Sequence, residues 1–480
     1  MKKKALTRFK NSIALMLMTG MVMAACAAPE TTDGSSEENA QSAESVTADS
    51  SYAKTGEGSG TEMSDAVENK VICTSARLPE EKYEGTAESF LFGDAYSDWA
   101  QAKAEAVEVS LEAQDGMDAY YLDMVSTFLK EGGETSVVCS PFNMYMALSV
   151  LAETADTETL AQILKLLQAP DKDTLAARVG TFWEANYADT PLMQELLANS
   201  LWLANDLAFR EETINRIAGE YHASVFRAPM GDQETNRALR DWVNTETKDL
   251  LKEYADNLEL QPETVAAIIS TLYNKAAWRD SFAKEGTTKQ TFHGVKGDTE
   301  ADMMHRSDRM QYYDQDGFTA VALPLTESGY MIFCLPDEGV ELASVISNPD
   351  SMKLFRDPLG EEGTDVQVNL TLPKFKVSGQ IDMKDGLKAL GITDAFEGDK
   401  ADFSSLTEEA DLILSEAIHA CMVETDEDGV TGAAYTALML SKTSLLEPEE
   451  EVDFVLDRPF YFAVTSEDNQ ILFAGTVCNS

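Results

Sequence analysis

The chain contains 480 residues, with 84 acidic and 37 basic side chains and a net charge of −47 at pH 7. A body this negative repels phosphate backbones and anionic lipid headgroups, which disfavours nucleic acid and heparin-like polyanions as partners. Because 44% of the residues are hydrophobic, the acidity does not indicate disorder along the whole chain. Beyond the N-terminus, no stretch of sequence is apolar enough to span a bilayer.

The first residues have the organisation of an export signal. Basic residues precede an apolar run over 13–22, and small residues then lead to Cys26. This ending resembles the bacterial lipoprotein signal, although Met23 is an unusual first residue for that motif. The resemblance implies that residues 1–25 are removed, that Cys26 is lipidated, and that the protein is extracellular and anchored to the bacterial cell membrane by its lipid alone. The alternative is an ordinary signal peptide followed by an unmodified cysteine.

A solvated tether follows the signal over residues 26–70. Residues 27–70 contain no Leu, Ile, Phe or Trp, and a flexible coil of this length reaches about 35 to 40 Å. The signal carries +5 and the tether −8, so −47 − 5 + 8 leaves −44 for the chain from residue 71 onward. The acidity therefore belongs to the folded body, which we divide into an N-terminal extension, 71–115, and a main domain, 116–480.

The cysteines beyond Cys26 are Cys73, Cys139, Cys334, Cys421 and Cys478. Their number is odd and no CxxC pair occurs, which argues against a metal centre or a redox motif. Cys139, Cys334 and Cys421 lie in apolar surroundings, where a thiol behaves as a small buried hydrophobe. We expect mostly free thiols, with a disulfide as the alternative.

Regular periodicity begins near Gly116. Apolar residues at helical spacing predict a helix over 117–128, and Ser140 followed by Pro141 predicts the start of a second helix. A third helix is predicted around 160–167. Later segments, 330–335 and 366–372, have the apolar runs and the alternation of strands. The mixture predicts an α+β body with mostly antiparallel strands.

The sequence contains few features that would indicate an enzyme. Only His222, His293, His305 and His419 occur, none of them in a paired metal-binding spacing, and no GxSxG, GxGxxG or P-loop sequence is present. We therefore predict no enzyme activity, no metal and no cofactor. A hydrolase that uses a single histidine as its base remains the enzymatic alternative.

Near the C-terminus, the run of small residues over 429–436 and the later block 457–462 strongly resemble the serpins. Further blocks resemble the family in the same order along the chain: Ser140-Pro141, Trp242-Val243-Asn244, Trp278 with Phe282, Leu372-Pro373-Lys374-Phe375, and His419 ten residues before Gly429. The resemblance covers nearly all of 116–480. It implies a serpin fold with three β-sheets, eight to nine helices and an exposed reactive-centre loop, and it implies inhibition of serine proteases by a suicide-substrate mechanism. In that mechanism the cut loop inserts into the main sheet as a new strand.

Insertion requires that alternate loop residues fit beneath the sheet. With Val430 first, the inward row is Val430, Gly432, Ala434, Thr436, Leu438 and Leu440, and the outward row begins with Thr431, Ala433 and Tyr435. No charge falls in the inward row. We therefore predict an insertion hinge formed by Glu427, Gly429, Val430, Thr431, Gly432, Ala433, Ala434 and Thr436. Without the resemblance, the same residues are typical of a flexible surface loop.

Counting fourteen residues from Gly429, as in a typical serpin, places the reactive bond between Thr443 and Ser444, which suits elastase-like proteases. Cleavage after Lys442 would suit trypsin-like enzymes, and cleavage after Leu440 or Met439 chymotrypsin-like ones. Glutamates at 447, 449, 450 and 451 disfavour proteases with acidic rims.

The resemblance also assigns Ser140, Asn143 and His419 to a shutter, a polar cluster beneath the sheet where it opens. Ser270 stands where the family has an asparagine. No basic helix occurs around 184–195, so activation by heparin is not expected, and we predict a monomer. The functional alternative is a non-inhibitory serpin-fold binding protein that proteases cleave only as a substrate.

Overall fold

The computed structural model describes residues 11–21, 71–75, 83, 85–91, 93–129, 134–360, 363–429 and 451–479. Within these ranges the chain forms 12 α-helices, eight of them with seven residues or more, and 17 strands. The predicted α+β class is confirmed. The predicted lipidation site Cys26, the tether and most of the predicted reactive loop lie outside the described residues.

The helices predicted at the start of the main domain are present. They are α3 (Met117–Phe128), α4 (Pro141–Thr154) and α5 (Thr157–Leu166). Ser140 caps α4 by accepting a hydrogen bond from the Asn143 amide, and Pro141 occupies the first turn, where no amide donor is needed. Two helices precede them, α1 (Ala87–Leu91) and α2 (Asp94–Glu112), which the sequence analysis did not predict. The remaining helices are α6 (Lys172–Asn186), α7 (Glu211–Glu220), α8 (Gln233–Glu246), α9 (Lys252–Ala255), α10 (Leu342–Ile346), α11 (Pro349–Arg356) and α12 (Lys384–Ala389).

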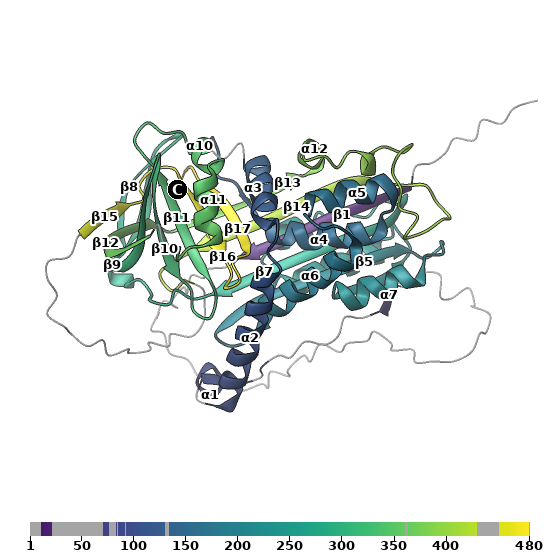
Figure 1. Ribbon diagram of the computed structural model, residues 1–480, viewed down its shortest axis with the longest axis horizontal. Coiled ribbons are helices and arrows are strands. Elements are labelled where there is room, and N and C mark those ends of the chain that lie inside the picture. The colour runs from purple at the N-terminus through teal and green to yellow at the C-terminus, as the bar shows by residue number, and fades with distance from the viewer. Residues whose placement is uncertain are drawn as a thin grey trace, which may run out of the picture.

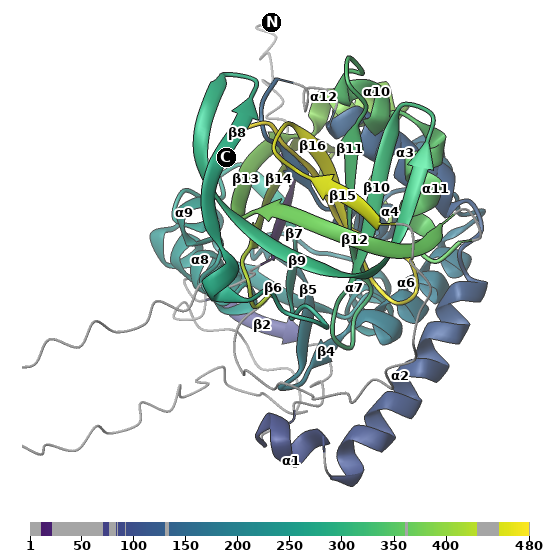
Figure 2. The same ribbon diagram turned by 90° about the vertical axis from the view of Figure 1, so that its left-hand side faces the viewer.

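A large sheet of eight strands forms one half of the molecule (Figure 1). Its strand order is β13-β14-β1-β7-β5-β6-β2, with the short β4 paired to β5. The strands are β1 (Asn11–Met21), β2 (Ile72–Ser75), β4 (Ala188–Asp189), β5 (Met193–Ala204), β6 (Ala223–Ala228), β7 (Thr264–Ala276), β13 (Phe375–Asp382) and β14 (Leu412–Thr425). Helices α4 to α7 lie along one face of this sheet, and α8 and α9 lie on the other (Figures 1 and 2).

Strand β1 has an unusual origin, because its residues are the apolar run of the predicted export signal. They form an eleven-residue strand between β7 and β14, parallel to both. Consequently β7 and β14 flank β1 and do not pair with each other.

The remaining nine strands are linked by hydrogen bonds in the order β15-β12-β9-β10-β11-β16-β17-β3, with β8 paired to β9. Their bounds are β3 (Val138–Cys139), β8 (Thr288–Gly294), β9 (Gly297–Gln315), β10 (Phe318–Pro324), β11 (Tyr330–Pro336), β12 (Thr364–Pro373), β15 (Glu451–Val455), β16 (Phe460–Thr465) and β17 (Ile471–Val477). The long β9 pairs with β8 and β12 over most of its length and with β10 near its end. It therefore belongs to two groups of strands, which with the large sheet make the three predicted sheets.

One hydrophobic core joins the sheets and most of the helices, and a smaller apolar cluster lies under α8. Cys139, Cys334 and Cys421 are fully buried, as predicted. No disulfide is formed among the cysteines that the structure describes. Among the described residues, no helix has the length and hydropathy needed to cross a membrane.

Candidate functional site

The candidate site is the slot between β7 and β14 together with the chain segment at its end. We use "slot" for the position that β1 fills. At its middle, Leu17 of β1 lies opposite Ser270 of β7 on one side and opposite His419 of β14 on the other. These two polar residues therefore mark the same level of the two flanking strands.

The start of α4 lies beneath this level and contacts both flanks. The Ser140 amide donates to Nε2 of His419 at 3.0 Å, which links α4 to β14. Nδ2 of Asn143 donates to the Ser270 carbonyl at 3.3 Å, and the Ser270 hydroxyl donates back to Oδ1 of Asn143 at 2.6 Å, which links α4 to β7. The structure thus brings together Ser140, Asn143 and His419, the three residues predicted to form the shutter. Ser270 takes part as well, in the place where an asparagine is expected.

His419 is fully buried, and burial lowers its pKa from 6.5 to about 3. The ring is therefore neutral at physiological pH. Because Nε2 accepts the bond from Ser140, the ring proton resides on Nδ1. That nitrogen has no hydrogen-bond partner among the described residues. The centre of the slot is consequently held by neutral hydrogen bonds, which carry a smaller desolvation cost than buried charges when they break and re-form.

At the end of β14 the chain makes a tight turn over 426–429, which we call the hinge turn. The Gly429 amide donates to the Asp426 carbonyl at 3.3 Å. The indole nitrogen of Trp278 donates to the same carbonyl at 2.8 Å, and the Phe282 amide donates to the Glu427 carbonyl at 2.9 Å. Trp278 and Phe282 follow β7, so the hinge turn joins the two flanking strands just beyond the end of β1.

Only glycine fits at position 429. Its φ is +82°, in the left-handed region, and an added Cβ would lie 2.2 Å from the backbone nitrogen of Trp278. This conformation reverses the chain direction immediately before the predicted inserting segment.

The hinge turn is charged, in contrast to the shutter. Glu427 is 6% exposed and pairs with Lys374 at 2.7 Å, while the Thr287 hydroxyl donates to it at 2.6 Å. Burial acts to raise the pKa of Glu427, but these two contacts outweigh burial and the pKa is lowered. For Asp426, burial dominates and raises the pKa from 3.8 to about 6, and the neighbouring Asp428 and Glu427 carboxylates add to this rise.

Some of the residues predicted for the hinge and the reactive bond lie within the described part of the chain, and others do not. Glu427 and Gly429, two of the residues predicted for the insertion hinge, lie in the hinge turn. Val430, Thr431, Gly432, Ala433, Ala434, Thr436, Lys442, Thr443 and Ser444 lie outside the described residues. Lys374 lies in a block that resembles the family, but its ion pair with Glu427 was not predicted. A distance of 53 residues along the chain gives no signal for such a pair. Within the described ranges, no group of three or more His, Cys, Asp or Glu side chains is arranged to hold a metal ion.

Comparisons with known proteins found similar sequences and similar folds. A model of the serpin (serine protease inhibitor) family matches residues 116–480. A serine protease inhibitor of Cyanea capillata is 26% identical over 369 residues, which is 75% of this chain and 96% of the relative. Tengpin, a thermophilic serpin in its native state, superposes with a TM-score of 0.66 at 26% identity and covers 76% of this chain and 95% of its own. Human thyroxine-binding globulin has the same TM-score at 23% identity, covering 77% of this chain and 99% of its own, which shows the fold alone.

Proposed function

We propose, from the premise that this chain belongs to the serpin family, that it inhibits serine proteases as a suicide substrate. The protease's catalytic serine attacks the carbonyl carbon of the reactive bond, for which Thr443–Ser444 is our first choice. An ester forms between the serine oxygen and that carbonyl, the peptide bond breaks, and the new amine of Ser444 takes a proton. Insertion of the severed loop into the large sheet then drags the protease along and deforms its active site before water hydrolyses the ester.

The observation that carries this proposal is the position of β1. The large sheet holds a complete central strand between β7 and β14, with backbone pairing on both sides. Room for one more strand is the physical requirement of the mechanism, since the free energy released on pairing the slot drives the distortion of the protease.

The predicted inserting segment has the same length as the strand that fills the slot, and the hinge turn would direct this segment back along the slot. Strand β1 occupies it with eleven residues, the same number as Val430 to Leu440. The hinge turn reverses the chain after β14, so an inserted loop would run antiparallel to β14, whereas β1 runs parallel to it. Cleavage at Thr443 leaves the acyl-enzyme just beyond the inserted residues, at the opposite end of the sheet from Gly429.

The chain cannot accept the loop while β1 fills the slot. Removal of residues 1–25 as an export signal would empty it, so inhibition belongs to the processed protein. We further propose that processing leaves a lipid on Cys26 and that the tether holds the body outside the cell. Incorporation of a labelled fatty acid, lost in Cys26→Ala, tests the anchor.

The mechanism is tested with the chain that begins at Cys26, mixed with elastase-like, chymotrypsin-like and trypsin-like proteases. We expect a one-to-one adduct that survives denaturing electrophoresis. Val430→Arg places a charge in the inward row and should abolish the adduct while cleavage continues. Thr431→Arg places the same charge on the outward row and should retain it. Cleavage without any adduct in the parent chain would instead identify a binding protein that is only a substrate.

The target class follows from the reactive bond and the charge. Thr443 favours elastase-like enzymes, with Lys442 and trypsin-like enzymes next. The charge of −44 from residue 71 onward favours proteases with basic surfaces, because electrostatic attraction accelerates encounter. We expect the association rate with a basic protease to fall steeply as salt is raised from 50 to 500 mM, roughly tenfold or more. A rate that does not respond to salt would contradict this preference.

A further inference from the structure

Helix α2 belongs to the N-terminal extension and lies wholly before the segment that matches the family model. It runs along the flank of the body beside α6, with α1 at its outer end (Figure 2). Its only basic residue is Lys103. Most of the helix surface is exposed. The contacts of this lysine therefore show how the helix is attached to the body.

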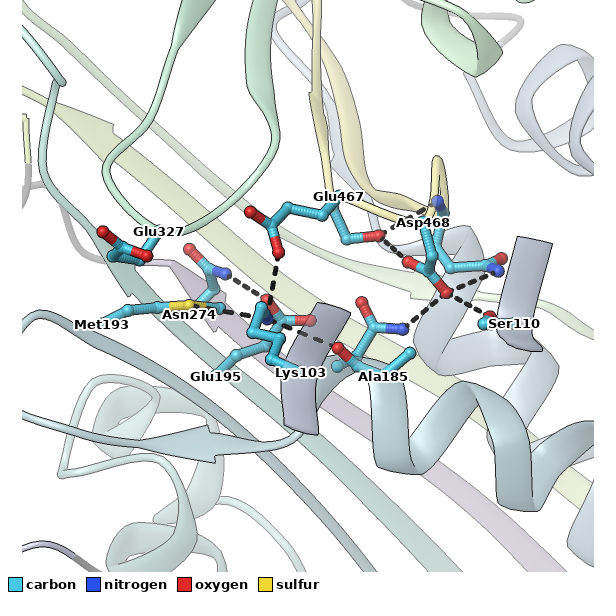
Figure 3. A network of polar contacts seen from close by, with 12 residues as sticks. Lys103, Ser110, Ala185, Met193, Glu195, Asn274, Glu327, Glu467 and Asp468 are labelled. Carbon is cyan, nitrogen blue, oxygen red and sulfur yellow. Dashed lines mark hydrogen bonds and ion pairs between the residues drawn. The ribbon is translucent and has the colours of Figure 1, made fainter. Parts of the chain in front are cut away.

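Lys103 points into the body. Its side chain is 10% exposed, and its Nζ lies 3.8 Å from Oε2 of Glu467 and donates to the Ala185 carbonyl at 3.4 Å (Figure 3). Two further polar contacts hold α2 in the same place. The Ser110 hydroxyl donates to Asp468 at 2.5 Å, and the Tyr96 hydroxyl donates to Glu327 at 3.0 Å.

The lysine faces a group of carboxylates that we call the acidic cluster: Glu195, Glu467 and Asp468. Glu195 and Asp468 are fully buried. Asp468 also accepts hydrogen bonds from Asn186 at 3.0 Å and Gln470 at 3.2 Å. Nδ2 of Asn274 donates to one oxygen of Glu195 at 3.1 Å, while the other oxygen has no partner among the described residues.

Charge is therefore poorly balanced around Glu195. The charged groups that face it are Lys103 from α2 and Asp468 and Glu467 from the turn between β16 and β17. Burial raises the pKa of Glu195 to about 8, Lys103 opposes this rise, and the two neighbouring carboxylates add to it. A proton on the unpartnered oxygen is thus the favoured state at neutral pH.

The acidic cluster joins β5 and β7, which lie on one side of the slot, to the turn between β16 and β17. Glu195 on β5 lies directly opposite Asn274 on β7, and the two strands pair over eleven positions, so they must move as one unit. Glu467 and Asp468 lie in the turn between β16 and β17, two strands that are not part of the large sheet. Asn274 is also the partner of Met21, the last residue of β1, so the cluster lies beside the end of the slot.

We propose that α2 is a strut that stabilises the large sheet with its slot filled, by fixing β5 and β7 against the turn between β16 and β17 through Lys103. With β1 in place, β7 lies two strand spacings from β14, about 9 to 10 Å. In this arrangement the contacts of Lys103, Ser110 and Asn274 are all made. The N-terminal extension then stabilises the large sheet when its slot is filled, either by β1 or by the inserted loop. This inference does not rest on protease inhibition, because it concerns the chain that still carries residues 1–25, with β1 in the slot.

The test compares Lys103→Met with Gln101→Met in the chain that still carries residues 1–25. Gln101 lies on the same helix and is exposed, and among the described residues its side chain donates to Glu105 of the same helix. Amide hydrogen exchange is followed in β1, β7 and β14, with β9 and β12 as an internal reference. We expect exchange in the first three strands to quicken about tenfold or more in Lys103→Met, with the reference strands and Gln101→Met unchanged. Faster exchange confined to α2 and α6, or no change at all, would overturn the proposal.

A pH profile separates the strut from a general packing role. The folded pKa of Glu195 is above the usual 4.5, so its stabilising contribution is full below about pH 4.5 and is lost as pH rises through about 8. Removing Lys103 removes the cation that holds this pKa down, and the midpoint of the loss should move to higher pH. Glu195→Gln should flatten the profile near pH 8. A midpoint in Lys103→Met that matches the parent would contradict the electrostatic link.

Should Lys103→Met fail to fold, Lys103→Arg decides the question, because it keeps the charge. Recovery of protection in β7 and β14 by arginine supports the strut. Loss of protection in the arginine variant as well would overturn it.

Discussion

The middle of the slot and its hinge end are both polar, but they are built on different principles. At the middle, a neutral imidazole, a hydroxyl and an amide connect α4 to the two flanking strands. At the hinge end, buried carboxylates and a lysine fix the turn that follows β14. Neutral hydrogen bonds can be exchanged for those of a new strand at small net cost, whereas a buried ion pair is costly to break. The slot is therefore held by exchangeable contacts at its middle and by a buried ion pair at its hinge end.

Gly429→Ala should break the hinge end most severely. The new Cβ would meet the Trp278 nitrogen in a left-handed conformation, and we expect a loss of about 3 to 4 kcal/mol in the free energy of unfolding. Gly391→Ala is the matched control, because its φ is also positive, +99°, while nothing lies within 4 Å of the added Cβ. That variant should lose only about 1 kcal/mol. Equal losses by urea denaturation would show that the contact with Trp278 is unimportant.

His419→Ala should break the middle of the slot. It removes a fully buried ring and leaves the Ser140 amide without its acceptor, which predicts a loss of about 2 to 3 kcal/mol. His293→Ala is the control, since that side chain is exposed and, among the described residues, pairs with Asp298; this variant should leave stability nearly unchanged. Thermal and urea unfolding of the two variants provide the comparison. A loss at His419 as small as the loss at His293 would contradict a stabilising role for the hydrogen bond between Ser140 and His419.

The two regions should also respond to pH in opposite senses. The pKa of His419 is depressed from 6.5 to about 3, so its contribution is full above pH 6.5 and is lost as pH falls, by about 1.4 kcal/mol per pH unit. The pKa of Asp426 is raised from 3.8 to about 6, so its contribution is full below pH 3.8 and is lost as pH rises through 6.

Stability measured between pH 4 and 7 in His419→Gln and Asp426→Asn separates these contributions. The histidine variant should lose the rising limb and the asparagine variant the falling one. Profiles that change in the same direction would mean that one of the two groups titrates normally.

The smallest effects should come from the two lysines at the hinge. Lys374 pairs with the buried Glu427, and Lys374→Met should cost about 1 to 2 kcal/mol. Lys284 pairs at 2.6 Å with Asp428, but both side chains are substantially exposed, so Lys284→Met should cost less than about 0.5 kcal/mol. Added salt should abolish the second effect and leave most of the first. The reverse order would show that burial does not set the strength of these pairs.

Much of this site was predictable because it depends on local chemistry. The Ser140-Pro141 start of α4 follows from capping rules, and the burial alternation of β12 follows from its period of two. The family resemblance supplied His419, Asn143 and Gly429. Helix α2 was missed because its exposed and buried residues give only a weak apolar stripe, and its lysine acquires meaning only beside Glu195, Glu467 and Asp468.

The sequence by itself determined the fold class, the start of α4 and the family, because capping, strand alternation and motif order are encoded by neighbouring residues. Only the tertiary structure decided that the apolar N-terminal run pairs between β7 and β14, that Lys374 neutralises Glu427, and that Lys103 reaches a buried carboxylate group. Each of these depends on which distant segments the sheets bring together. Pairing across tens or hundreds of residues leaves no local pattern, since it depends on the fold rather than on adjacent side chains.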